Sequence, residues 1–262
     1  MNASISPNKE PGLLPDTHMP DGVVHALGGR PRRLKVGGIT PFTATDYPGQ
    51  LSTVIFVQGC PWRCGYCHNP HLQARTSHSP IHWADVLALL ERRRGLVDAV
   101  VFSGGEPTMD PGLANAIREV RDLGFKIGLH SGGTHPDRLK SVLPMLDWVG
   151  FDIKALFANY ARVTQVAGSG EPALAGLKAI LASGVDYECR TTLHPALLPE
   201  TEIIELAQTL ARLQVKNYAL QVFREQGCSD AALNASMEHG YPSPKVIAQV
   251  SNLFPVFTLR RG

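Results

Sequence analysis

The sequence predicts an α/β fold with a parallel β-sheet, and three observations point to it. Six short runs rich in Val, Ile, Phe and Thr alternate with stretches of helical periodicity. Strand, helix, strand units in succession give parallel strands joined by right-handed crossovers. The unusual motifs follow strands, at the edge where parallel α/β folds carry their sites. Periodicity alone leaves two architectures open, an open doubly wound sheet and an incomplete barrel.

The predicted strands are apolar runs bounded by turn residues, as expected of strands that are covered on both faces. Each run is short enough to suit a strand better than a helix. In chain order the strands span residues 51–58, 97–104, 126–131, 148–155, 186–193 and 218–223.

The predicted helices have apolar residues spaced three and four apart, which places one apolar stripe on each helix. The spacing is clearest at Trp83, Val86, Leu87 and Leu90. Further stripes run from Leu113 to Leu123, Leu174 to Leu181, Ile203 to Leu213 and Val246 to Phe254. Ser243 and Pro244 predict the start of the last helix. Gly95, Gly124 and Gly184 follow three helices where left-handed caps are expected.

The chain is expected to form one domain behind a mobile extension. Residues 1–33 are rich in Pro, Gly and polar residues and lack apolar periodicity. Residues 34–262 carry all the predicted strands and helices, and a chain of 262 residues with 44% hydrophobic content can build one sizeable core. We therefore place the domain boundary near residue 34.

Charge and composition narrow the classes of molecule that the protein is expected to bind. Lys plus Arg number 25 and Asp plus Glu 23, so the net charge of +2 gives no argument for nucleic acid or an anionic membrane. A neutral-surfaced substrate or a protein partner fits better. The sequence has neither a long apolar run nor a secretory signal, which predicts a cytoplasmic protein without membrane contact. Five cysteines, an odd number, suit thiols better than a disulfide framework.

Three cysteines lie within eight residues, at Cys60, Cys64 and Cys67. Three thiolates are one short of the four that usually close a zinc site or an iron–sulfur cluster. A fourth protein ligand would have to come from His68, His71, Cys189 or Cys228. The spacing alone favours an iron–sulfur cluster over zinc. A cluster with three protein thiolates keeps one iron open to another ligand.

The motif Cys60-x-x-x-Cys64-x-Tyr66-Cys67, with Gly104-Gly105-Glu106-Pro107 after the next strand, resembles the radical S-adenosylmethionine (SAM) superfamily. Within it, "TDYPGQLSTVIFVQGCPWRCGYCHNP" and "YECRTTLHP" resemble the glycyl-radical-enzyme activases. The chain is most similar to the activating proteins of anaerobic ribonucleoside-triphosphate reductase, over about residues 35 to 225. The resemblance implies a partial (β/α)6 barrel.

The resemblance also implies the cofactors and the reaction. Cys60, Cys64 and Cys67 would bind three irons of a 4Fe-4S cluster, and the amino and carboxylate groups of SAM would chelate the fourth. An electron from a flavodoxin- or ferredoxin-type donor would break SAM into methionine and a 5′-deoxyadenosyl radical. That radical would take a hydrogen atom from a glycine of an anaerobic ribonucleotide reductase. The alternatives are a pyruvate formate-lyase-type activase, a radical SAM enzyme acting on a small molecule, and a zinc-stabilised binding module without catalysis.

Candidate cofactor-binding residues follow the second and fourth predicted strands. Gly104 and Gly105 lack Cβ atoms, so the backbone there can approach the methionine ammonium of SAM, with Glu106 holding either the loop or the ammonium. The alternative is an ordinary strand-to-helix turn. Asp152 and Lys154 lie two residues apart and face the same side of a strand. The resemblance places them near the ribose or carboxylate of SAM; the alternative is a mutually satisfied ion pair.

Further candidates follow the first, third and fifth predicted strands. By resemblance Tyr66 packs near the adenine. Arg190 would meet the cofactor carboxylate or form a structural ion pair. Ser131 would hydrogen-bond the cofactor. Activases of this kind usually carry Asp-Thr-Asn-Gly after the third strand, and this chain has His130-Ser131-Gly132-Gly133. Histidine cannot replace the Asp charge, so the cation site of relatives is not carried over.

Overall fold

The computed structural model describes residues 32–236 and 240–261. The predicted extension, up to residue 31, lies outside the described residues. The described residues belong to one compact unit. Within the described ranges no helix combines the length and the apolar character that crossing a membrane requires.

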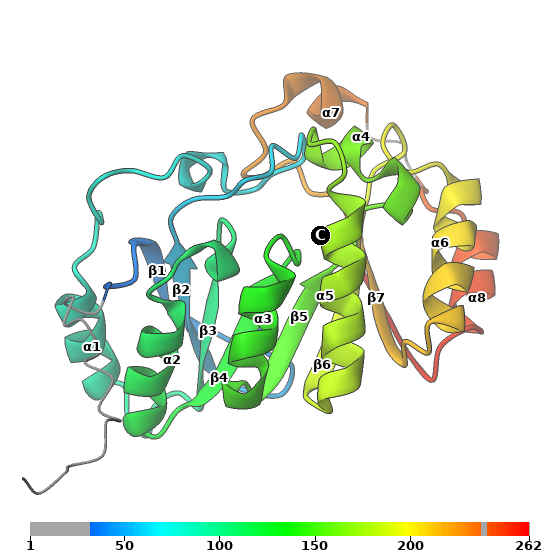
Figure 1. The fold of residues 1–262 in the computed structure, drawn as a ribbon. Helices are drawn as coiled ribbons and strands as arrows, with labels where there is room; N and C mark the ends of the chain where they lie inside the picture. The colour runs from blue at the N-terminus through cyan, green and yellow to red at the C-terminus, as the bar shows by residue number, and fades with distance from the viewer. Residues whose placement is uncertain (1–31, 237–239, 262) are drawn as a thin grey trace, which may run out of the picture. The chain divides into compact units, whose positions relative to one another are not determined.

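One sheet runs through the described part of the chain, with eight strands in the order of the sequence (Figure 1). The six predicted strands are confirmed. They are β2 (Ser52–Val57), β3 (Ala99–Gly104), β4 (Lys126–Ser131), β5 (Trp148–Asp152), β6 (Asp186–Leu193) and β7 (Asn217–Val222). Consecutive members of this set are parallel.

Two edge strands were not predicted. β1 (Val36–Thr43) pairs antiparallel with β2, and β8 (Val256–Arg260) pairs parallel with β7. The sequence of β1, "VGGITPFT", contains two glycines and a proline, which strand interiors normally exclude. No residue of β8 is fully buried. Neither strand therefore carries the apolar run of a central strand.

The predicted helices are confirmed as α1 (Trp83–Glu91), α2 (Leu113–Asp122), α5 (Gly170–Ser183), α6 (Glu200–Arg212) and α8 (Pro244–Ser251). The unpredicted helices are shorter: α3 (Pro136–Val142), α4 (Ala161–Thr164) and α7 (Ala231–Ala235), with 3-10 turns at Pro70–Leu72, Pro107–Met109, Leu143–Met145 and Phe157–Asn159. Gly95, Gly124 and Gly184 have φ values of +75°, +92° and +76°, which is the left-handed geometry predicted for them. Ser243 precedes α8 as expected, but its hydroxyl donates to Glu200 instead of capping the helix.

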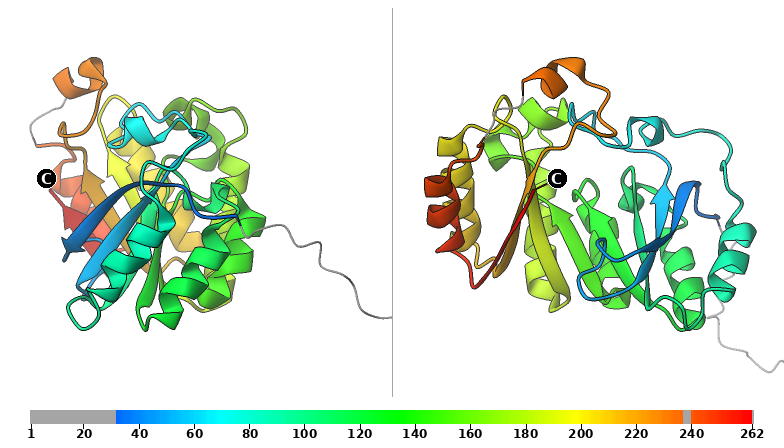
Figure 2. Two further views of the ribbon diagram at one scale, coloured as in Figure 1. Left: turned by 90° about the vertical axis from the view of Figure 1, so that its left-hand side faces the viewer. Right: turned by 180° about the vertical axis from the view of Figure 1, so that it is seen from behind.

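The strand order decides between the two architectures. A doubly wound sheet reverses its order at a switch point and carries helices on both faces. Here the order never reverses, and Figure 2 shows the major helices on one face of a curved sheet. The fold is therefore an incomplete barrel of parallel strands with an antiparallel first strand.

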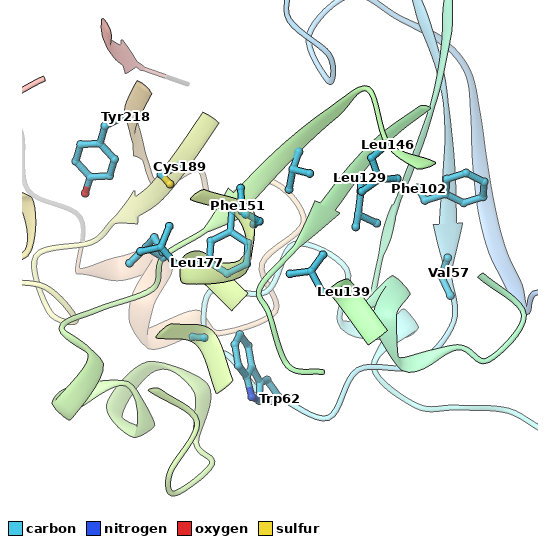
Figure 3. Close-up of a cluster of buried hydrophobic side chains, with 14 of the residues drawn as sticks. Val57, Trp62, Phe102, Leu129, Leu139, Leu146, Phe151, Leu177, Cys189 and Tyr218 are labelled. Carbon is cyan, nitrogen blue, oxygen red and sulfur yellow. The ribbon is translucent and has the colours of Figure 1, made fainter. Parts of the chain in front are cut away.

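The main core lies between the sheet and these helices. Phe102, Leu129 and Phe151 of adjacent strands pack there with Leu139 of α3 and Leu177 of α5 (Figure 3). The inner face has a small apolar cluster of its own, in which the ring of Tyr47 stacks on Trp148 at a centroid distance of 5.0 Å. Toward the carboxyl ends of the strands the inner face becomes polar, and the candidate site lies there.

Candidate functional site

A cavity of about 810 Å³ opens at the carboxyl ends of the strands. Its volume is within the range of ligand sites. All the predicted site residues line it: Cys60, Cys64, Tyr66, Cys67, Gly104, Gly105, Glu106, Ser131, Asp152, Lys154 and Arg190. His68, Asn69 and His130 line it as well. Residues spread over 130 positions of sequence meet here because each follows or ends a parallel strand.

The cysteine loop is held by backbone hydrogen bonds at its start and near its middle. Gly59 N–H donates to the carbonyl of Leu72 at 2.7 Å, and Arg63 N–H donates to the carbonyl of Thr164 at 2.9 Å. Between these points Trp62 is buried and packs edge-on against Tyr160 with ring centroids 5.7 Å apart. A Cβ at Gly132 would lie 2.5 Å from the Trp62 ring. The sequence analysis missed Trp62, whose role depends on partners about 70 and 100 residues away.

The three thiols suit a polynuclear iron cluster. All are free and partly exposed to the cavity. Burial raises the pKa of Cys60 to about 12 and also raises the pKa of Cys64. Burial thus disfavours the thiolate form of these two side chains, and bound iron would supply the positive charge that thiolates need. Among the described residues no three metal-ligating side chains are grouped to hold one ion; in a cluster, each thiolate binds a different iron.

The Gly-Gly-Glu loop packs directly on the cysteine loop. Gly105 N–H donates to the carbonyl of Val57 at 2.9 Å, and Glu106 N–H donates to the carbonyl of Gly59 at 2.8 Å. A Cβ on Gly105 would lie 2.2 Å from the Gly59 carbonyl oxygen. Gly104 has a φ of +111°, and a Cβ there would lie 2.4 Å from the Val57 nitrogen. The two glycines are required for this contact between loops, a reason that the sequence analysis did not foresee.

Glu106 connects this loop to the end of the next strand. Its side chain is buried, with the residue 2% exposed. One carboxylate oxygen accepts hydrogen bonds from Thr108 N–H, the Thr108 hydroxyl and the Ser131 hydroxyl, at 3.1, 2.6 and 2.9 Å. The other accepts from Gly132 N–H at 2.9 Å. Of the two roles considered for Glu106, the contacts support holding the loop.

Asp152 and Lys154 form an ion pair, which the sequence analysis considered as an alternative to cofactor binding. Both residues of the pair also line the cavity. The Lys154 ammonium lies 3.4 Å from the Asp152 carboxylate and 5.7 Å from the centre of the Tyr66 ring. Burial alone would lower the pKa of Lys154, but the Asp152 carboxylate raises that pKa well above its ordinary value. The Tyr160 hydroxyl accepts from Lys154 N–H at 3.0 Å and donates to the Asp152 carbonyl at 3.3 Å.

Arg190 also has a carboxylate partner within the chain. Its Nε donates to Glu188 at 2.8 Å, and its guanidinium packs over the Trp148 ring at 4.9 Å. Arg260 of β8 binds the same carboxylate with two hydrogen bonds of 2.8 and 2.9 Å. Burial would raise the pKa of Glu188, but the two guanidinium groups lower it. The sequence analysis missed both Glu188 and Arg260.

His130 is a neutral group. Its Nε2 lies 2.8 Å from the Asp46 carbonyl and its Nδ1 lies 3.2 Å from the Ser103 hydroxyl. Burial, with the adjacent Arg190 charge, lowers the pKa of His130 to about 4. Nε2 also lies 3.2 Å from a guanidinium nitrogen of Arg190, so the Asp46 carbonyl requires a proton on Nε2 and the Arg190 donor requires a lone pair there. The imidazole therefore supplies no charge where related activases carry Asp.

His194 and the two other cysteines, Cys189 and Cys228, lie away from the cavity lining. His194 is buried, and its Nε2 lies 2.9 Å from the Leu233 carbonyl. Cys189 is buried in β6, where burial raises the pKa of its thiol. The Cys228 thiol donates to the carbonyl of Gly65 at 3.5 Å, beside the cysteine loop. Neither thiol lines the cavity.

The chain forms an incomplete α/β barrel that carries three thiols and a Gly-Gly-Glu loop at its rim. This combination indicates a class of cofactor-dependent enzymes, and comparison with known protein families identifies that class. The profile described as "Radical SAM superfamily" matches residues 54–213, which is more than half of the chain. The chain belongs to this superfamily. Its cofactors are a 4Fe-4S cluster and SAM. A zinc-stabilised binding module is therefore the wrong interpretation of the three cysteines.

Two relatives carry activase names. A Methanocaldococcus jannaschii protein named as a glycyl-radical enzyme activating enzyme is 30% identical over 207 residues, covering 74% of this chain and 82% of that protein. The pyruvate formate-lyase-activating enzyme of Clostridium pasteurianum is 28% identical over 176 residues, covering 65% of this chain and 73% of that enzyme.

A solved structure is similar in fold. Streptococcus suis SuiB bound to SAM superposes with a TM-score of 0.59 at 14% identity. The superposition covers 78% of this chain and 48% of SuiB, so the chain matches about half of that larger protein. At this identity the likeness concerns the fold, and it agrees with the incomplete barrel.

Glu106 gives the first prediction. In Glu106→Gln the new amide NH₂ must face at least one of the four donors that now bind the carboxylate. We expect the free energy of unfolding to fall by about 1–3 kcal/mol, the cost of an unsatisfied buried polar group. Urea unfolding of the variant and of Glu205→Gln, an exposed position on α6, measures the difference. Equal stability of the two variants would contradict the role given to Glu106.

Proposed function

We propose that this radical SAM enzyme is an activating enzyme that generates a glycyl radical on an anaerobic ribonucleotide reductase. The observation that carries the proposal is the single open cavity that holds the three thiols, the Gly-Gly-Glu loop and the Asp152–Lys154 pair. Relatives named as activating enzymes, matched over most of their length, support a protein substrate. The reductase is favoured by the sequence resemblance around the cysteine loop and "YECRTTLHP".

The thiols of Cys60, Cys64 and Cys67 would hold the cluster. When bound, the cluster and SAM supply a 5′-deoxyadenosyl radical after one-electron reduction. The hydrogen bonds at Gly59 and Arg63, with the buried Trp62, hold the first half of the loop backbone. A loop held in this way lowers the entropic cost of binding the cluster. An external flavodoxin- or ferredoxin-type protein would be the electron donor.

The residues beside the cysteine loop would hold SAM. Lys154 is a partly buried cation that lines the cavity, which suits the SAM carboxylate or ribose, and Asp152 keeps it charged and in place. Tyr66 offers an aromatic face beside it for the adenine. Gly104, Gly105, Ser131 and Arg190 complete the proposed cofactor lining. Ser131 already donates a hydrogen bond to Glu106, and Arg190 donates one to Glu188. These two residues would therefore also hold the cavity lining in place.

A pyruvate formate-lyase-type activase is the second candidate. The Clostridium pasteurianum relative is the observation that favours it. The same cavity would serve either protein, because both receive a radical on a glycine. The two candidate functions differ only in the protein that receives the radical.

Cys64→Ser tests the cluster assignment. Since a serine hydroxyl is a poor ligand for iron, we expect the variant to lose most bound iron and acid-labile sulfide after anaerobic reconstitution. Cys228→Ser is the matched control, because that thiol lies beside the same loop but does not line the cavity. Iron and sulfide analysis of both proteins measures the effect. A Cys64→Ser protein with a full iron complement would refute the assignment.

Lys154→Ala tests the SAM assignment. The variant should keep its cluster but bind SAM at least about tenfold more weakly, because it loses a buried cation beside the proposed carboxylate position. Calorimetric titration of SAM into the reconstituted protein measures the affinity, with the exposed Lys178→Ala on α5 as control. Unchanged SAM affinity would remove Lys154 from the site.

The function itself is tested by electron paramagnetic resonance. The reduced protein is mixed anaerobically with SAM and either the anaerobic reductase or pyruvate formate-lyase of the source organism. We expect a glycyl radical signal with the reductase, and none with a reductase whose target glycine is replaced by alanine. A signal with the lyase alone would move the assignment to the second candidate, and SAM cleavage without any protein radical would leave only the superfamily assignment.

A further inference from the structure

The segment that carries the cysteine loop contains no acidic residue. Between Asp46 and Asp85 the sequence has neither Asp nor Glu, although it includes Arg63, Arg75 and four histidines. The near-neutral charge of the whole chain conceals this local bias. An acidic partner that approached the cysteine loop from outside the cavity would therefore meet no repelling carboxylate on the loop itself.

Cationic residues gather around the turn that follows the Gly-Gly-Glu loop. The backbone N–H of Lys35 and the guanidinium of Arg75 both donate to the same carboxylate oxygen of Asp110, at 3.2 and 3.0 Å. Arg138 of α3 donates to the neighbouring carbonyl of Met109 at 2.5 Å. Three cations from separate parts of the chain thus meet at one turn.

Two further arginines lie at the same turn. The backbone of Arg32 and Arg33 runs against Gly112, where a Cβ would lie only 2.6 Å from the Arg32 carbonyl oxygen. Both arginines are exposed. We call this group of residues the outer cationic patch: Arg32, Arg33, Lys35, Arg75 and Arg138.

The patch keeps an excess of positive charge. Within the described residues, four of its five members form no ion pair: Arg32, Arg33, Lys35 and Arg138. Asp110, which pairs with Arg75, is buried. Glu119 lies beside the two N-terminal arginines and accepts a hydrogen bond from the Trp83 indole. These two carboxylates are fewer than the cations around them.

The patch adjoins the start of the cysteine loop but lies outside the cavity. A Cβ at Gly59 would lie 3.2 Å from the Arg75 Cβ and 3.3 Å from the Met109 sulfur. Arg75 also donates to the carbonyl of Gln58 at 3.3 Å, two residues before Cys60. No member of the patch lines the cavity. A partner bound at the patch would therefore lie next to the cluster loop without competing for the space of SAM or substrate.

We propose that the outer cationic patch docks the protein that donates the electron, through an acidic face of that donor. This inference rests on the proposed function in one respect, that the electron comes from a protein. One electron passes from the reduced donor to the cluster, so the donor is oxidised, the cluster is reduced and no atom is transferred. Complementary charge speeds the encounter of such partners, whose interfaces are small. Cations also attract nucleic acid, but the position beside the cluster loop favours the donor.

Calorimetric titration tests the docking directly. Flavodoxin of the source organism is titrated into the full chain, reconstituted with its cluster, at an ionic strength of about 50 mM, where screening is weak. A triple variant that removes three charges of the patch should bind flavodoxin about tenfold more weakly, since each exposed charge pair contributes modestly. Its substitutions are Arg32→Gln, Arg33→Gln and Arg138→Gln.

A control variant removes the same number of charges away from the patch, at the carboxyl ends of α1 and α6. All three of its positions are exposed, and it should bind flavodoxin as tightly as the wild-type chain. Its substitutions are Arg92→Gln, Arg94→Gln and Arg212→Gln. Because the two triple variants have equal net charge, the comparison isolates the position of the charges.

Stopped-flow absorbance measures electron transfer in the same proteins. Reduced flavodoxin, below saturation, should reduce the cluster of the patch variant about tenfold more slowly, because lost steering lowers the association rate. Photoreduced deazaflavin is a small reductant that needs no docking surface. It should reduce the cluster at the same rate in the wild-type chain and in both variants.

Four outcomes would overturn the inference. The wild-type chain might be expected to lose flavodoxin affinity between about 50 and 300 mM salt; constant affinity, or no binding, would refute the docking without any variant. Equal losses in the two triple variants would show that net charge alone matters. Slower reduction by deazaflavin in the patch variant would make the patch a support of the cluster loop. Tighter binding of duplex DNA than of flavodoxin would make it a nucleic-acid site. None of these measurements uses the glycyl radical or the protein that receives it, so they succeed or fail separately from the proposed function.

Discussion

The site depends on one contact, the backbone junction between the cysteine loop and the Gly-Gly-Glu loop. Gly105 and Glu106 donate to the carbonyls of Val57 and Gly59, and the Gly105 Cα lies where a side chain would overlap the Gly59 carbonyl. The Glu106 carboxylate then continues the connection to Ser131 at the end of β4. Three consecutive strand ends are thereby held by hydrogen bonds that the chain makes without any cofactor. The positions of the thiols follow from this scaffold, because the loop that carries them cannot move independently of β3 and β4.

Charge on the inner face is tolerated because these charged side chains have partners of opposite charge. Lys154 is paired with Asp152, and Glu188 is shared by Arg190 and Arg260. Gly150 makes the second arrangement possible, since a Cβ there would lie 2.8 Å from both the Arg190 guanidinium and the His130 ring. Buried ion pairs contribute little net stability compared with apolar residues. Their concentration around one cavity is therefore better explained by ligand binding than by folding.

The sequence was sufficient for the central strands and for the predicted site residues that line the cavity. β2 to β7 carry short apolar runs bounded by turn residues, and the motifs at their ends meet because parallel strands end at one edge. Local sequence could not predict β1, whose glycines and proline are untypical of strands, or β8, which is only partly buried. It also could not predict the partners of the site residues. Trp62 with Tyr160, and Glu188 with Arg260, are contacts between segments about 70 to 100 residues apart, and neither partner carries a motif of its own.

His130 shows how one substitution changes the electrostatics of such a site. The Arg190 guanidinium lies 3.2 Å from the His130 ring, which adds no negative charge beside it, so its charge is balanced by Glu188 and by the nearby Asp152. Glu188 also binds Arg260, so one carboxylate serves two cations. Around His130 the cavity lining carries both signs of charge, because Asp152 lies close enough to influence both His130 and Arg190. The electrostatics of this part of the site therefore depend on two carboxylates, Glu188 bound to Arg190 and Asp152 paired with Lys154.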